Sequence, residues 1–149
     1  MILLGINLNH GDSSACIVKD GKILSLIEEE RINRIKHWAG VPLASIIECL
    51  NNNNLKMTDI DAICLNYNKR SNIFIKLKFI FNNLKKINFF IKYAKNKNNN
   101  LSQILKKHFK NNDLPKIVYN NHHKCHISHA FYTSGFDKAI GLSIDGMGD

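Results

Sequence analysis

Short apolar runs separated by polar turns dominate the first third of the chain. Residues 2–8 are apolar, include β-branched side chains and lead into a cluster of turn formers, which predicts a buried strand that feeds a tight polar turn. Residues 15–18 and 23–27 flank Asp20-Gly21, and an Asp-Gly pair between two apolar runs favours a type I′ hairpin. The pattern therefore predicts three consecutive antiparallel strands.

The hydrophobic period then changes from that of a strand to that of a helix. After Pro42, which suits a first helical turn, apolar residues recur at positions 43, 46, 47 and 50, the spacing of an amphipathic helix packed against a sheet. Further along the chain, the same reasoning predicts strands at residues 60–67, 116–119 and 139–144, helices at 101–109 and 123–133, and one or two helices between 73 and 95.

This order of elements is that of an RNase H-like unit, the half-domain of the actin and sugar-kinase superfamily. The fold class is accordingly α/β, with a mixed five-stranded sheet. Residues 4–12 and 141–149 echo each other, since both run from an apolar strand into a glycine-containing polar turn. Two unrelated strand ends would give the same echo, because Gly and Asp are common in turns.

If the echo reflects a duplication, residues 1–138 form the first half and 139–149 begin a second, truncated half. A lysine-rich helical insertion is expected at about residues 69–113. In duplicated folds of this kind, the two turns face each other across a cleft and offer backbone N–H groups to phosphate oxygens. The candidate phosphate-binding residues are Gly11, Asp12, Gly146 and Gly148.

Charge is concentrated in the middle of the chain. The 149 residues carry 21 Lys+Arg and 12 Asp+Glu, a net charge of +9, yet residues 62–112 hold twelve of the basic residues and no acidic one. The remaining nine basic and twelve acidic residues give −3. A phosphate-tracking patch for nucleic acid is one interpretation, but the chain has no RNA-binding motif and a lysine-rich helix face is usually just solvated. We therefore do not expect nucleic acid as a partner.

The cysteines fall at irregular spacings, with no Cys-x-x-Cys, so neither a thioredoxin motif nor a four-cysteine zinc knuckle is available. A reduced, cytoplasmic setting is the simplest interpretation. The apolar stretch at residues 73–81 is interrupted by lysines and is too short to cross a bilayer, so we expect no membrane partner.

Four of the seven histidines lie within residues 122–129. In a helix, His122, His126 and His129 would share one face, and the i, i+4 spacing lets two imidazoles reach one metal ion. Asp145, after the next predicted strand, could supply a carboxylate, and such mixed ligation suits iron, manganese or zinc. A histidine-rich helix start whose side chains cap, pack or meet solvent explains the cluster equally well.

Two further segments admit more than one role. Residues 28–37 carry dense alternating charge, for which ion pairs in solvent are the simpler interpretation. Alternatively, Arg34, Lys36 or His37 faces a cleft and binds a phosphate or carbamoyl group. His10 is either a plain turn residue or a general base, if its turn forms the cleft wall.

Three segments together resemble the amino-terminal part of the carbamoyltransferase family that modifies aminoglycosides, cephalosporins and nodulation factors. They are residues 5–16, residues 28–37, and a last segment that runs from His-His-Lys-Cys-His at 122–126 to Asp-Gly-Met-Gly at 145–148. All three occur in the family's order, and the match runs from residue 5 to residue 149 apart from the lysine-rich middle.

The resemblance implies an O-carbamoyltransferase. In the family, a carboxy-terminal YrdC-like domain turns carbamoyl phosphate and ATP into carbamoyl adenylate. The amino-terminal domain, similar to the universal tRNA threonylcarbamoyl-transfer protein, passes the carbamoyl group to a hydroxyl of a small molecule or sugar. The residues that match the family's motifs are His122, His126 and Asp145 as ligands of a divalent metal, His10 as the catalytic histidine, and Lys36 and His37 as the pair after Glu-Glu-Arg.

The chain also departs from the family. His129 stands where a small residue is common, and the adenylate-forming domain and a further metal ligand are absent from the 149 residues. We therefore expect a fragment that cannot complete the reaction by itself. Two other functions stay open: a tRNA-modifying relative that binds RNA through the basic middle, and a simple metal-binding module.

Overall fold

The computed structural model describes residues 1–9, 11–67, 81–82 and 100–144. Its centre is a mixed five-stranded sheet in the order β3-β2-β1-β4-β5. β1 pairs antiparallel with β2 and parallel with β4, and β4 pairs parallel with β5. The strands span Ile2–Asn7 (β1), Ser14–Lys19 (β2), Lys22–Glu28 (β3), Ala62–Leu65 (β4) and Lys116–Tyr119 (β5). The predicted α/β class and mixed sheet are thus confirmed.

The β2–β3 hairpin forms at the predicted Asp-Gly turn. Asp20 and Gly21 have φ angles of +49° and +81°, the left-handed values that a type I′ turn requires at both central positions. The twist of this turn matches that of its flanking strands, so the local sequence is sufficient to fix the pairing of β2 with β3.

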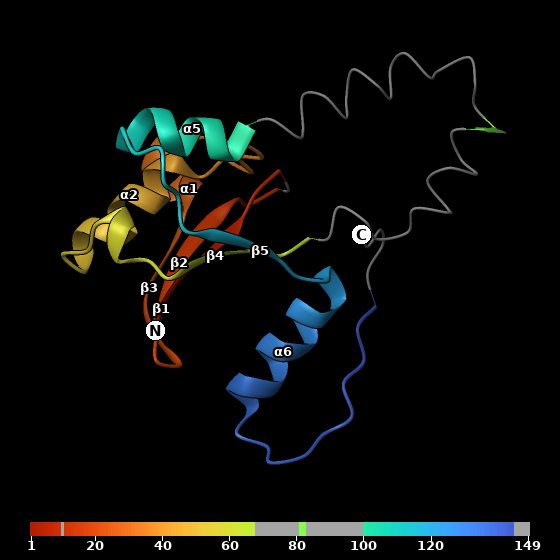
Figure 1. Cartoon of the computed structure of the whole chain (residues 1–149). Coiled ribbons are helices and arrows are strands. Elements are labelled where there is room, and N and C mark those ends of the chain that lie inside the picture. Colours follow the sequence, from red (N-terminus) through yellow and green to blue (C-terminus); the bar gives the residue numbers. More distant parts are fainter. Residues whose placement is uncertain (10, 68–80, 83–99, 145–149) are drawn as a thin grey trace.

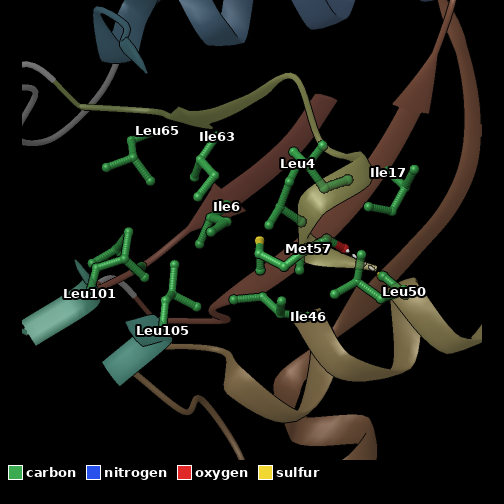
Figure 2. Close-up of a cluster of buried hydrophobic side chains, with 14 residues drawn as sticks. Leu4, Ile6, Ile17, Ile46, Leu50, Met57, Ile63, Leu65, Leu101 and Leu105 are labelled. Carbon is green, nitrogen blue, oxygen red and sulfur yellow. Dashed lines mark hydrogen bonds between the residues drawn. The ribbon is translucent and has the colours of Figure 1, made fainter. Parts of the chain in front are cut away.

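One face of the sheet carries the hydrophobic core. Helices α1 (Glu29–Asn33), α2 (Leu43–Asn52) and α5 (Asn100–Phe109) lie together on that side, whereas α6 (His122–Ser134) extends away from the sheet beyond β5 (Figure 1). Alternate residues of β1, β2 and β4 point at α2 and α5, as the period of a strand dictates. Figure 2 shows the resulting cluster, which includes Leu4, Ile6, Ile17, Ile46, Leu50, Met57, Ile63, Leu65, Leu101 and Leu105.

α5 belongs to this core. Leu105 is fully buried and Leu101 is nearly so, and the helix connects the parallel strands β4 and β5, as a crossover helix does. α5 thus packs in the core, while the extent of the insertion, residues 69–113, stays a prediction. The helices predicted between residues 73 and 95 lie outside the described residues, apart from the pair 81–82, which is helical.

The structure contains two short helices that the sequence pattern does not predict, α1 and a 3-10 turn at Met57–Asp59 (η1). α1 lies in the charged segment that was expected to be solvated. Glu29 is 5% exposed, and its two carboxylate oxygens accept hydrogen bonds from the backbone N–H groups of Ala44 (3.2 Å) and Ser45 (2.8 Å) at the start of α2. Since α2 has no side-chain cap of its own, Glu29 satisfies N–H groups that the helix leaves open.

The sixth strand predicted at residues 139–144 is wrong. The segment has no strand pairing, and its three alternating apolar side chains, Ile140, Leu142 and Ile144, are at least 81% exposed. The period-2 pattern is present, but a strand also needs a neighbour for its backbone groups, and no described strand lies beside this segment.

Within the ranges that the structure describes, no helix combines the length and apolar character needed to cross a bilayer.

Candidate functional site

The polar residues of interest gather at one edge of the sheet. β1, β4 and β5 are parallel, so their carboxyl ends meet there, and ligands of open α/β sheets bind outside this edge. Asn7 ends β1, Asn66 follows β4, and Asn121 follows β5 and starts α6 by accepting a hydrogen bond from the N–H of Lys124 at 3.0 Å. The predicted site segments all begin at this edge.

The turn after β1 is fastened to residues 37–40. The N–H of Asn9 donates to the carbonyl of Gly40 at 3.3 Å, and the N–H of Ser13 donates to the carbonyl of Trp38 at 3.0 Å. The buried Ser13 hydroxyl adds a 2.9 Å bond to the Gly40 carbonyl. Two segments that lie far apart in the sequence, and that both carry predicted site residues, are thereby joined.

His37 and Asp12 meet across this junction. His37 Nδ1 lies 2.9 Å from Asp12 Oδ1, and the backbone N–H of His37 donates to Glu30 Oε2 at 3.0 Å. The hydrogen bond that the His37 ring donates to the Asp12 carboxylate raises the pKa of His37. The negative charge of Asp12 and then that of Glu30 add to the effect. Asp12 and His37 have φ angles of +63° and +56°, so the fold holds both residues in a strained backbone conformation.

Asp12, Glu30 and His37 also present three possible ligand atoms within 4.8 Å of one another, the one such group among the described residues. Both predicted phosphate-binding residues in this cluster, Asp12 and His37, already pair with each other. Lys36 is exposed beside them, and a Cβ added at Gly11 would meet nothing within 4 Å, so the rim of the turn is open. The structure thus brings together Gly11, Asp12, Lys36 and His37.

His122 and His126 form a pair on the first turns of α6. Their Nε2 atoms are 3.1 Å apart, and His122 Nδ1 lies 3.3 Å from the backbone carbonyl of Asn66. A carbonyl can only accept, so Nδ1 of His122 carries the proton and Nε2 keeps its lone pair in the neutral ring. The predicted i, i+4 arrangement is confirmed, while His123 points elsewhere, with Nδ1 2.9 Å from Ser143 Oγ.

The spacing of the pair fits a shared metal ion. Two imidazole nitrogens at roughly 2.0–2.1 Å from one ion, with a ligand angle of 90–110°, stand about 2.9–3.4 Å apart. The observed 3.1 Å lies in that interval. No described carboxylate or third histidine, His129 included, completes a group of three with this pair.

A pair of amides connects the turn to the histidines. Asn66 Nδ2 donates to Asn7 Oδ1 at 2.9 Å, and Asn7 Nδ2 donates to the backbone carbonyl of Asp12 at 3.2 Å. Sequence reading found neither asparagine nor the role of Glu30, since their importance depends on which strands become neighbours. The signal available was that both asparagines lie near the carboxyl ends of the strands predicted at residues 2–8 and 60–67.

Four predicted site residues, His10, Asp145, Gly146 and Gly148, lie outside the described residues. Their assigned roles stay predictions.

Three of the four cysteines have a raised thiol pKa, which disfavours the nucleophilic thiolate. Burial raises the pKa of Cys16 and of Cys64, which line the uncovered face of the sheet, and burial raises the pKa of Cys49 in the core. All four cysteines are free.

Polar turns and a histidine pair at the carboxyl edge of the sheet are typical of α/β proteins that bind a ligand at that edge. Comparison with known proteins gives the family. Residues 2–149 match the family described as Carbamoyltransferase N-terminus, so this chain belongs to the carbamoyltransferase family and corresponds to its amino-terminal region.

Two curated relatives are similar to this chain over most of its length. The chain is 33% identical to the uncharacterized protein sll1178 of Synechocystis sp., with 99% of this chain and 26% of that protein covered. It is 32% identical to the nodulation protein NolNO of Sinorhizobium fredii, with 93% of this chain and 20% of that protein covered. The chain therefore spans about a quarter or less of these curated relatives.

Among solved structures, YeaZ from Pseudomonas aeruginosa is similar at 16% identity and a TM-score of 0.31, over 43% of this chain and 28% of that one. This likeness is too weak to support an argument.

Proposed function

We propose that this chain is the amino-terminal part of an O-carbamoyltransferase, which passes a carbamoyl group from carbamoyl adenylate to a hydroxyl of a small molecule or sugar. The observation that carries the proposal is the family match over residues 2–149, combined with the convergence of its motif segments at one sheet edge. The sheet order and strand directions agree with an RNase H-like half-domain, which binds ligands at that edge.

The residues at the edge divide into two groups. Residues 9–13 and 36–40 would bind the carbamoyl donor. Lys36 would supply positive charge, as would His37 in the charged form that its raised pKa favours, and Gly11 leaves room for close approach to the backbone. His10 would take the proton of the acceptor hydroxyl as the hydroxyl oxygen attacks the carbamoyl carbon, and the bond from that carbon to the adenylate phosphate oxygen would break to release AMP. Asp12 and Glu30 raise the pKa of His37, which favours its charged form, and they hold its ring and its backbone N–H in place.

The second group would hold a divalent metal. His122 and His126 present nitrogens at a suitable separation, Asp145 would add a carboxylate, and nitrogen and oxygen ligands of this kind suit iron, zinc or manganese. When bound, such an ion offsets negative charge on the donor phosphate and on the oxyanion that develops during transfer. Asn66 supports the arrangement because its backbone carbonyl accepts a hydrogen bond from Nδ1–H of His122.

Sustained transfer would require parts of the family's proteins beyond the region matched here. The donor would be made from carbamoyl phosphate and ATP by a YrdC-like domain, and a second half-domain beginning near residue 139 would close the cleft. The exposed apolar residues at 140, 142 and 144 are available for such packing. We propose that residues 1–149 cannot sustain the reaction by themselves.

The experiment is to express the complete reading frame that contains these residues and to measure carbamoylation of added hydroxyl compounds from carbamoyl phosphate and ATP. The Lys36→Ala variant should lose most of the transfer, and Lys116→Ala, which removes a lysine of β5 outside the proposed site, should retain it. Carbamoylation that is unaffected by Lys36→Ala would contradict the assigned donor site. Absence of any carbamoyl transfer, with metal binding intact, would favour the metal-binding module instead.

A further inference from the structure

Asn7 and Asn66 occupy equivalent places at the ends of neighbouring parallel strands. β1 and β4 pair with Ile6 opposite Leu65, so the next residues along the two strands are Asn7 and Asn66. Their side chains meet through the 2.9 Å bond from Asn66 Nδ2 to Asn7 Oδ1. The register of the sheet thus creates a contact between amides that are 59 residues apart.

On one side, this amide pair holds the turn after β1. Asn7 Nδ2 donates to the carbonyl of Asp12, and the Asp12 carboxylate meets His37. Asp12 has a φ angle of +63°, which costs energy for a residue other than glycine and needs support from its surroundings. The amide of Asn7 and the ring of His37 supply that support from opposite ends of the same residue.

On the other side, Asn66 holds the histidine pair. Its backbone carbonyl accepts a hydrogen bond from Nδ1–H of His122, which leaves Nε2 of His122 directed at His126. The same residue therefore contacts the histidines through its backbone and the turn through its side chain.

Stability does not explain an asparagine at position 66. Its Oδ1 is buried and has no hydrogen-bond partner among the described residues, and an unsatisfied buried acceptor destabilises a fold. An apolar side chain of similar size would remove this cost but would also take from Asn7 Oδ1 the bond that Nδ2 donates, so the contact with Asn7 is the feature that the asparagine provides. Polar groups retained against stability are typical of functional sites.

We propose that the Asn7–Asn66 amide pair is a positioning device that keeps the turn at residues 9–13 in fixed relation to the His122–His126 pair. The proposal rests on the proposed function, in which the turn binds the carbamoyl donor and the histidines hold a metal ion. Neither asparagine contacts the reacting groups, so both act through the residues that they hold.

The test uses the 149-residue chain, labelled for NMR, with single-residue variants. Asn7→Ala removes the support of the Asp12 carbonyl, and Asn66→Leu removes the link between the amides while it retains the backbone carbonyl that His122 needs. Asn53→Leu is the matched control, because Asn53 also joins two elements by hydrogen bonds, to Ser25 Oγ and to the Cys49 carbonyl, away from the sheet edge. Thermal unfolding of each variant identifies any that fails to fold.

The first readout is the pKa of His37, measured without metal. In Asn7→Ala it should fall toward the ordinary histidine value, because Asp12 is no longer held against the ring. Asn53→Leu should leave it unchanged. An unchanged His37 pKa in a folded Asn7→Ala variant overturns the proposal.

The second readout is coupling between the two sites when Zn²⁺ is added. In the unaltered chain, Zn²⁺ binding should shift the Asp12 amide resonance, and this shift should be absent in His126→Ala, which separates it from direct binding of Zn²⁺ at Asp12, Glu30 and His37. Asn66→Leu keeps the backbone carbonyl that contacts His122, so its affinity for Zn²⁺ should fall by less than the roughly 10-fold that follows loss of such a contact. The same variant should lose most of the shift at Asp12. A full shift in that variant overturns the proposal. If the unaltered chain does not bind Zn²⁺, the metal site of the proposed function fails, and the His37 readout then decides the positioning proposal.

Discussion

Glu29 has a structural role within a charged motif that also contributes Glu30 to the proposed site. It stands between Glu28 and Glu30, yet the three carboxylates face different surroundings. Glu28 pairs with Arg31 in solvent, Glu30 holds the backbone of His37, and Glu29 is buried against the start of α2. The carboxylate of Glu29 thereby fixes the strand-to-helix connection on which the site segment 37–40 depends.

Replacing Glu29 by Ala should lower the free energy of unfolding by about 2–3 kcal/mol, because two backbone N–H groups at the start of α2 lose a charged acceptor. Urea denaturation monitored by circular dichroism measures this. Glu28→Ala is the control and should change stability by less than about 1 kcal/mol, since its pair with Arg31 is exposed. Equal effects of the two substitutions would show that Glu29 is not a cap.

His37 is the titrating residue of the site. Asp12 and then Glu30 favour its charged form, so its pKa is raised above the ordinary value. A raised pKa in the folded state means that the pair stabilises the fold at pH values below the ordinary histidine pKa. This stabilisation is lost as the pH rises through the raised pKa of the folded state.

Replacing Asp12 by Asn should therefore return the pKa of His37 to its ordinary range. NMR titration of the imidazole Cε1–H resonance measures it. Asp113→Asn is a matched control with the same charge change at an exposed site. A raised pKa that survives in Asp12→Asn would assign the shift to a different neighbour.

At the scale of elements, close approach between β1 and β2 depends on Gly5. A Cβ at this position would lie 2.6 Å from Cys16 Sγ, in the register that pairs the two residues. Because β1 carries Asn7 at its end, the seating of this strand also sets the position of the turn that follows. α6 differs, since none of its residues is buried and its histidine face is held mainly by contacts at its first turns.

Gly5→Ala should destabilise the chain by about 1–2 kcal/mol through overpacking against the Cys16 side chain. The Gly5→Ala/Cys16→Ala double variant should recover about 1 kcal/mol relative to the sum of the single effects. Gly11→Ala, where an added Cβ meets open space, is the control for the glycine-to-alanine change. Additive effects in chemical denaturation would mean that the clash is relieved elsewhere.

The histidine face of α6 makes a separate prediction. The full chain should bind one Co²⁺ or Zn²⁺ ion, and His122→Ala or His126→Ala should each reduce the affinity at least about 10-fold, because each removes a ligand. His129→Ala, one turn further along the same helix, is the control and should bind normally. Metal content that does not change in the first two variants would remove the site.

At the scale of the whole molecule, the positive charge is concentrated in one part of the chain. The twelve basic residues between 62 and 112 outweigh the balance of −3 elsewhere, whereas residues 5–16 carry one acidic residue and residues 28–37 carry both signs. β4, Asn66 and α5 lie within this basic segment, and the other strands and the histidine pair of α6 lie outside it.

The basic segment should therefore not confer specific RNA binding. Fluorescence anisotropy with a tRNA should give only weak affinity, with no dependence on Lys-to-Glu changes between residues 76 and 110 beyond that expected from net charge. Tight binding that falls steeply with salt and is lost in those variants would instead support the tRNA-modifying relative.

The sequence determined the elements, and local physics explains why. Period-2 runs, the Asp20-Gly21 turn and the apolar spacing after Pro42 each specify structure within a few residues, so β1 to β3, α2 and β5 could be predicted with small errors at their ends. The i, i+4 meeting of His122 and His126 is likewise a property of any helix. Residues 139–144 show the limit, because a strand pattern without a pairing partner does not form a strand.

Only the tertiary structure decided which distant residues act together. The burial of Glu29, the pairing of Asp12 with His37 and the contact between Asn7 and Asn66 all depend on sheet register and on the path of residues 37–40 across the first turn. A hydrogen bond requires two partners within about 3 Å, and local sequence does not encode a distance between strands separated by more than fifty residues. The residues of the proposed chemistry can therefore be predicted from the sequence, while the contacts and distances among them depend on the fold.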